Sequence, residues 1–331
     1  MSNGLQGLTE SLAQINQKIA DFEKTIATGD TAFPIRENLA AEAKLVVNVN
    51  TPLLNRFPTK QGSGKAAAWK EITSFGSDPS SVFFAEGGTP SGRTTVYADR
   101  SETYRLLGLD GGVTGFAVAA GASFQDQLQL EKRNTIFHLK NLEEDALINA
   151  PGTGQSYSGL LTQITTANGS YSASSTGTPG SALIADLDAL LQSSWDKGVE
   201  ISIFVVRSTE AKLISQALTS DSGNSALRVI MPGPSGITGG FFVNKYLSPI
   251  TGRVAEIVPD IKHTTATIIG VVERLPEPVV GQGDAGILID TLLDYALSDV
   301  PVTADIFSFR VKKYATLAIP ARKFCGVITD F

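Results

Sequence analysis

The sequence has very little of the side-chain chemistry on which enzymes and metalloproteins depend. Of its 331 residues, one is cysteine and two are histidine. A single cysteine cannot form an intrachain disulfide, and Cys325, with Phe324 and Val327 nearby, is expected to be a buried apolar thiol. His138 and His263 lie too far from each other in the sequence to form a zinc-ligand pattern. We therefore expect no metal site and no cofactor.

Long apolar runs and blocks of positive charge are also missing. No stretch approaches the roughly 20 apolar residues of a membrane-spanning helix. The N-terminus lacks the basic start and apolar run of a signal peptide. A formal net charge of −6 argues against a sequence-specific nucleic-acid reader, which usually carries a basic face. These absences predict a protein that folds in a cytosol, makes no membrane contact and touches DNA only non-specifically.

Two apparent catalytic motifs fail on inspection. Residues 62–65 read Gly-Ser-Gly-Lys, but a phosphate-binding loop needs a glycine where Thr59 stands and a Ser or Thr where Ala66 stands. Residues 154–159 resemble a nucleophile elbow, but Ser158 occupies the position of its second glycine. No catalytic constellation remains, and we expect a protein that is not an enzyme.

An acidic triplet, Glu143-Glu144-Asp145, is the remaining candidate for acid–base chemistry. Consecutive residues of a helix point in different directions. The triplet is therefore interpreted as a solvated helix face and not as a carboxylate pair.

What the sequence does contain is a succession of α and β patterns with many turns, set by 32 glycines and 15 prolines. An amphipathic helix is predicted over residues 5–27, docked on another molecule or, alternatively, on its own domain. A hairpin follows, with strands at 66–73 and 94–98 and a polar tip between them. A long helix over 123–149, capped by Ser123, comes next.

An α/β lobe is expected after this helix. It has helices near 183–195 and 210–218, and strands near 201–206, 254–258 and 265–272. Three further strands, over 306–311, 314–319 and 325–328, are expected to close the chain, the first two as a pair. The predicted fold class is α+β.

This order of elements resembles the Hong Kong 97-type major capsid proteins of tailed bacteriophages. The match begins at Ala146-Leu147-Ile148-Asn149-Ala150-Pro151-Gly152-Thr153-Gly154, followed by Gly159-Leu160, where the family ends its spine helix in a glycine-rich turn. Phe204-Val205-Val206-Arg207 and the loop Asp221-Ser222-Gly223-Asn224 form a looser match to the strand and axial loop of the family. The order and spacing of these short motifs, from about residue 40 onward, carry most of the specificity.

The resemblance implies an N-terminal arm over 1–50 and an extended hairpin loop with its base over 51–108. It implies a peripheral domain formed by 109–182 and 300–331, with the spine helix at 123–149. Residues 183–299 would form an axial domain. The hairpin is expected to reach over a neighbouring subunit. Because residues 300–331 contain no asparagine, the lysine-to-asparagine cross-link of some relatives is not expected.

The implied function is that of a structural subunit of a virion. Subunits would assemble in the host cytoplasm into hexamers and pentamers of an icosahedral head around double-stranded DNA, with a portal and with scaffolding or cement proteins as partners. The alternative is an encapsulin-type nanocompartment shell, which has the same fold. Twelve residues are candidates for contacts between subunits: Leu12, Ile15, Ile19, Phe22, Trp69, Phe83, Phe84, Arg93, Asp221, Asn224, Pro232 and Pro234.

Overall fold

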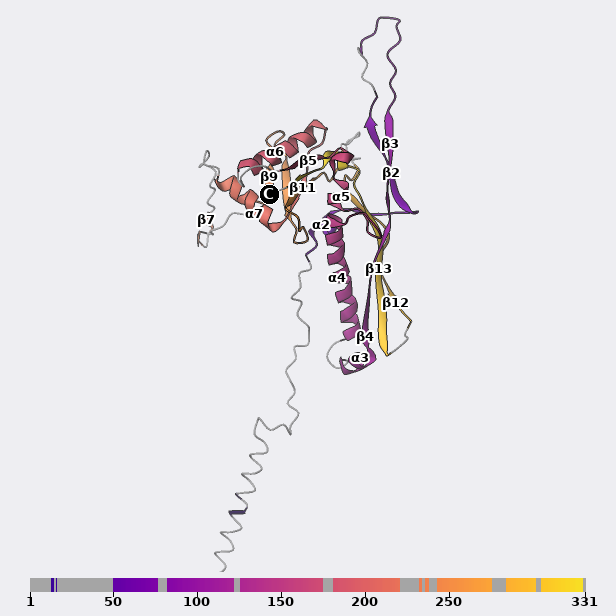
Figure 1. Cartoon of the computed structure of the whole chain (residues 1–331), viewed down its shortest axis with the longest axis vertical. Helices are drawn as coiled ribbons and strands as arrows, with labels where there is room; N and C mark the ends of the chain where they lie inside the picture. The colour runs from indigo at the N-terminus through magenta and orange to yellow at the C-terminus, as the bar shows by residue number, and fades with distance from the viewer. Residues whose placement is uncertain are drawn as a thin grey trace, which may run out of the picture. The chain divides into compact units, whose positions relative to one another are not determined.

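The computed structural model describes most of the chain beyond residue 49. The described residues are 13–14, 16, 50–76, 82–121, 126–174, 181–220, 232–233, 236–237, 243–275, 284–301 and 305–329. The chain divides into two units, Met1–Leu45 and Val46–Phe331. In the first unit Ala13, Gln14 and Asn16 are helical, and the rest of the helix expected over 5–27 lies outside the described residues. The second unit contains the sheets of the fold and the helices that pack on them (Figure 1).

A four-stranded sheet has the order β1 (Thr59–Gln61), β12 (Leu288–Asp299), β13 (Ile306–Ala318) and β4 (Arg105–Thr114). β13 pairs antiparallel with both of its neighbours, and β1 pairs parallel with β12. On β13, Phe309 and Val311 are fully buried. Phe309 lies opposite Gly111 of β4, where an added Cβ would come within 2.5 Å of the phenyl ring. The glycine therefore makes room for the ring.

The spine helix α4 (Gln127–Asn149) packs along β4 and β13 (Figure 1). At 1.5 Å per residue its length is about 35 Å. Leu139 packs with Phe309 and Val311 in a small core between helix and sheet. The expected Ser123 cap was wrong: the N-cap is Asp126, whose carboxylate accepts a hydrogen bond from the Gln129 N–H. Ser123 itself lies outside the described residues.

The turn that ends α4 has the compact geometry implied by its glycines. Gly152 adopts a φ of +70°, which favours glycine. The Gly159 N–H donates to the Ala150 carbonyl, and an added Cβ at Gly159 would lie 2.8 Å from the Ala146 oxygen. The chain therefore folds tightly back on the end of the helix before α5 (Leu160–Gln163) begins.

A second sheet has six strands and contains most of the hydrophobic core. Its order is β5 (Tyr171–Ser174), β14 (Gly326–Thr329), β11 (Thr267–Val271), β6 (Ile203–Val206), β10 (Val254–Pro259) and β9 (Lys245–Leu247). All residues of β6 and β11 are buried. Helices α6 (Ser181–Asp196) and α7 (Ser208–Ser220) pack on this sheet. The α/β lobe predicted from the sequence is confirmed.

The predicted hairpin is also present, as β2 (Ala66–Ser74) paired with β3 (Val96–Thr103). The shorter elements are α2 (Pro52–Arg56), α3 (Gly115–Gly121), β7 (Pro232–Gly233), β8 (Gly236–Ile237) and two 3-10 turns, Thr166–Asn168 and Arg322–Phe324.

The prediction of two closing strands over 306–311 and 314–319 was wrong. These residues form the single strand β13, because the intervening Lys312 and Lys313 continue the alternation and Lys313 is buried. The partner of β13 is β12, which lies on the other side of the domain boundary expected at 299/300. β14 likewise pairs within the six-stranded sheet, so strand pairing crosses that division twice.

Candidate assembly surfaces

The hairpin exposes apolar side chains along much of its length. Its exposed large apolar residues are Ile72, Phe75, Val82, Phe83, Phe84, Val96 and Tyr97. Phe83 has 89% of its surface exposed and Phe84 has 59%. Apolar groups gathered on an outer surface mark a site of interaction with another molecule. Phe83 and Phe84, two of the predicted contact residues, are therefore exposed, as a contact with another molecule requires.

Arg93 lies just before β3 and contacts the opposite side of the hairpin. Its Nε donates to the Phe75 carbonyl at 2.6 Å, and its guanidinium lies 5.3 Å from the centre of the Phe75 ring. Arg93 therefore joins the two sides of the hairpin within one subunit, while its side chain stays exposed.

The base of the hairpin is attached to its own subunit. The Trp69 indole donates to Glu71 at 3.0 Å, and Arg100 donates to the same carboxylate at 3.1 Å. Arg322, which is 7% exposed, pairs with Glu71 at 3.5 Å and lies 6.0 Å from the Trp69 ring. Burial raises the pKa of Glu102, and the charge of Arg322 partly opposes that shift. Trp69, predicted as an inter-subunit contact, thus has partners within its own chain.

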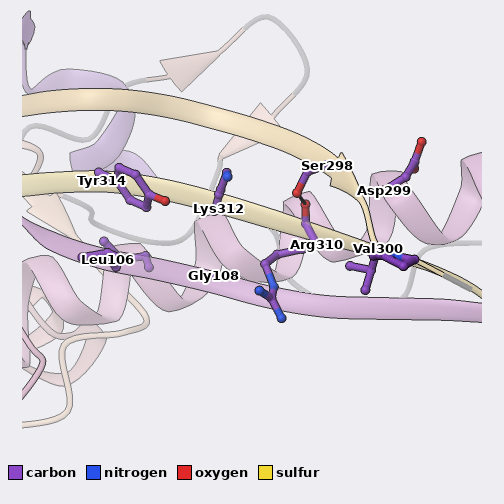
Figure 2. Close-up of a pocket in the computed structure, with 10 residues that line it drawn as sticks. Leu106, Gly108, Ser298, Asp299, Val300, Arg310, Lys312 and Tyr314 are labelled. Atoms are coloured by element: carbon purple, nitrogen blue, oxygen red, sulfur yellow. Dashed lines mark hydrogen bonds between the residues drawn. The ribbon is translucent and has the colours of Figure 1, made fainter. Parts of the chain in front are cut away.

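A shallow groove of about 380 Å³ crosses the outer face of the four-stranded sheet (Figure 2). Leu106 of β4 is 70% exposed there and lies near Tyr314 and Lys312 of β13. Arg310 donates two hydrogen bonds to Asp110, at 2.6 and 2.7 Å, which hold the pKa of that carboxyl below its ordinary value. The groove combines exposed apolar surface with fixed charges.

The acidic triplet on α4 is not a solvated face, and that interpretation was wrong. Glu143 and Glu144 are both 0% exposed. Glu143 forms an ion pair with the buried Lys313 at 2.8 Å and accepts a hydrogen bond from the Tyr295 hydroxyl. The Lys313 ammonium also lies 4.4 Å from the centre of the Tyr295 ring. This face of the helix is therefore buried with its charge compensated by β13.

Glu144 has a different set of partners. Its two carboxylate oxygens accept hydrogen bonds from the backbone N–H groups of Leu53 and Leu54, at 2.7 and 2.8 Å. These residues lie in the first turn of α2, so the spine helix holds that short helix in place. Burial and the neighbouring Asp260 raise the pKa of Glu144 above its ordinary range.

Reactive groups of the described chain have structural roles. Cys325 is fully buried, as expected, and burial raises the pKa of its thiol to about 12. The buried His263 ring contacts the Thr267 carbonyl at 2.8 Å. Ser156 donates to the Thr153 carbonyl at 2.8 Å. Among the described residues no group of three or more His, Cys, Asp or Glu side chains is placed to hold a metal ion. None of the described helices is long and apolar enough to cross a membrane.

Seven of the twelve predicted contact residues lie outside the described residues: Leu12, Ile15, Ile19, Phe22, Asp221, Asn224 and Pro234. An eighth, Pro232, lies in β7, but nothing is described of its side chain. Sequence reasoning missed the exposed apolar residues Phe75 and Leu106, because short alternating strands do not reveal which face is covered.

No protein-family model and no curated protein sequence matches the chain. Solved structures do match over nearly its whole length. The capsid asymmetric unit of cyanophage A-1(L) covers 90% of this chain and 97% of its own, at 12% identity and a TM-score of 0.65. The capsid of a native GTA particle covers 92% of this chain and 98% of its own, at 13% identity and a TM-score of 0.63.

A third similar structure is the holo-SrpI encapsulin complex from Synechococcus elongatus PCC 7942. It covers 87% of this chain and 92% of its own, at 15% identity and a TM-score of 0.57. At such low identity the likeness concerns the fold. The spine helix on its four-stranded sheet, the projecting hairpin and the α/β lobe thus make up the Hong Kong 97-type capsid fold.

Proposed function

We propose that this chain is the major structural subunit of a tailed-phage head. Hexamers and pentamers of the chain would close into an icosahedral shell around double-stranded DNA. The observation that carries the proposal is the combination of a capsid fold with a hairpin that exposes apolar side chains near its tip, at Val82, Phe83 and Phe84. In this account the hairpin lies over a neighbouring subunit, and repeated heterologous contacts generate closed rings.

The proposed domain division follows the same model. Residues 1–50 act as an arm, 51–108 as the extended hairpin loop with its base, 109–182 and 300–331 as the peripheral domain, and 183–299 as the axial domain. The subunit does no catalysis. Its other partners are a portal, scaffolding or cement proteins and, non-specifically, the packaged DNA. Assembly takes place in the host cytoplasm, and the mature location is the virion.

Substitutions at the hairpin tip test the proposed contact. We expect the Phe83→Ser/Phe84→Ser chain to fold but to lose closed shells, because the apolar tip no longer buries surface in a neighbour. Circular dichroism checks folding, and sedimentation velocity with electron microscopy checks assembly. The Thr89→Ser chain, altered at another exposed position near the tip, should assemble normally. Normal shells from the double variant would contradict the proposed role of the tip.

Deletion of residues 76–93 extends the same test. The shortened chain should retain cooperative unfolding while its assembly is impaired, because the hairpin base is held by Trp69, Glu71 and Arg322 below the deleted segment. Loss of cooperative unfolding would instead make the tip part of the subunit core.

A second candidate function is an encapsulin-type compartment shell, favoured by the similarity to the SrpI encapsulin complex. The two functions differ in what the particle contains. A phage head is expected to hold nuclease-protected DNA and one portal vertex, whereas a compartment shell is expected to hold cargo enzyme and no portal. Mass spectrometry and nucleic-acid analysis of particles from the native source distinguish them.

A further inference from the structure

The loop between β10 and β11 is tied to two other elements, on either side of one buried histidine. The side chain of Asn149, the last residue of the spine helix, donates to the Lys262 carbonyl at 2.9 Å. Arg207, between β6 and α7, donates to the Thr264 carbonyl at 3.3 Å. The residue between these two tethers is His263, which is 1% exposed. The loop therefore closes over His263 and joins the end of the spine helix to the six-stranded sheet.

The contacts of the His263 ring are those of a neutral imidazole. Nε2 lies 2.8 Å from the Thr267 carbonyl oxygen and 3.1 Å from the Thr267 hydroxyl. A carbonyl oxygen only accepts hydrogen bonds, so the hydrogen of the neutral ring is on Nε2. Nδ1 is buried and has no hydrogen-bond partner among the described residues. A second proton would therefore put a new donor and a positive charge where none of these residues supplies an acceptor, which is unfavourable in a buried site.

Carboxylates near the ring already accept hydrogen bonds from other groups. The charged side chains of the loop and of the adjoining ends of the spine helix and α7 are Glu144, Asp145, Arg207, Glu210, Asp260 and Lys262. The Glu210 carboxylate is bound by Arg207 at 2.6 and 3.0 Å. Asp260 accepts the Lys262 N–H at 2.8 Å. Burial is the largest effect on the ring and lowers the pKa of His263, against the opposing charges of Glu210 and Asp260. Arg207 acts in the same direction as burial.

We propose that His263 is an acid-sensitive switch that keeps the β10–β11 loop closed only while its ring is neutral. The neutral ring donates to Thr267 and the loop stays closed over it. When the ring takes up a second proton as the pH falls, the cation becomes hydrated only if the loop opens. Opening breaks the tethers from Asn149 and Arg207, so the end of the spine helix loses its contact with the loop of the six-stranded sheet.

Amide hydrogen exchange of the full-length chain, between about pH 7.5 and about pH 5, tests the switch. After correction for intrinsic exchange, protection of the peptide that contains Lys262, His263 and Thr264 should fall by up to roughly tenfold for each pH unit below about 6.5, the ordinary pKa of a histidine. The reason is that in this range the open loop binds one proton more than the closed loop. Protection of β6 should stay constant, because only the loop opens.

Two variants separate the effects of the two histidines of the chain. Glutamine has an N–H that can donate to Thr267 but takes up no proton, so His263→Gln should make protection of the loop independent of pH. His138 is exposed on the spine helix, and His138→Gln should keep the fall in protection.

Retention of the fall in His138→Gln assigns it to His263 even where His263→Gln does not fold, because the chain has no third histidine. Constant protection in the unchanged chain, persistence of the fall in a folded His263→Gln chain, or its loss in His138→Gln would overturn the switch. These contacts lie within one subunit, so failure of the proposed shell function would leave this test intact.

Discussion

At the scale of single residues, the most consequential feature is charge buried beneath the spine helix. Glu143 and Lys313 lie 170 positions apart in the sequence and meet at 2.8 Å with almost no exposure. A helical pattern shows that Glu143, Glu144 and Asp145 diverge, but it does not show what covers each one. The partners come from a distant strand and from α2, which explains why sequence reasoning placed these residues in solvent.

Removal of the lysine should be strongly destabilising. We expect Lys313→Met to lower the free energy of unfolding by about 3 kcal/mol, because Glu143 would remain buried without its cation. Urea denaturation of dissociated subunits measures this change. Lys312→Met, in the same strand but only partly buried, is the control and should change stability little. Combining Lys313→Met with Glu143→Gln should recover part of the loss, and a similar cost for both single lysine variants would contradict the account.

The raised pKa of Glu144 has a definite consequence for stability. Between the ordinary pKa of a glutamate and the raised value, the folded chain binds more protons than the unfolded chain. The contribution of Glu144 to stability is therefore full at low pH and is lost as the pH rises through this window. Glu144→Gln should flatten the fall in unfolding free energy across this window, which ends at about pH 8. An unchanged pH profile would contradict the assignment.

At the scale of elements, long regular segments were predictable and their partners were not. Two strand-forming runs separated by a polar, turn-rich stretch predicted the hairpin, and strand-forming runs also predicted β6, β10 and β11. The join between 306–311 and 314–319 was missed because the two central lysines resemble a turn, although Lys313 is buried and forms an ion pair with Glu143. Strand β12 (Leu288–Asp299) was not predicted from the sequence, because shifts in its register with β13 interrupt the alternation of buried and exposed side chains.

Attachment of the hairpin base to Arg322 is a prediction at this scale. We expect Arg322→Met to increase amide exchange in β2 and β3, because Trp69 and Glu71 lose their contact with the subunit body. Exchange in the six-stranded sheet should change little. Lys323→Met, at the neighbouring exposed position, serves as the control. Equal exchange in the hairpins of both variants would show that Arg322 does not anchor the hairpin.

At the scale of the whole molecule, the order of elements carried more information than any single motif. Arm, hairpin, spine helix, glycine-rich turn and α/β lobe pointed to the Hong Kong 97-type fold, and structures of phage and encapsulin shells share that fold with this chain. The inter-subunit surfaces were less predictable. Their exposure depends on tertiary packing, and seven of the twelve predicted contact residues lie outside the described residues.

Electron microscopy of the purified full-length chain tests the proposed function most directly. The account predicts closed shells of uniform diameter, whose averaged images show icosahedral symmetry with rings of five and six subunits. Mass photometry of the same sample should show particles far heavier than the 34.9 kDa subunit. A stable, dispersed monomer at physiological concentration, with no shells under conditions that favour assembly, would contradict the account.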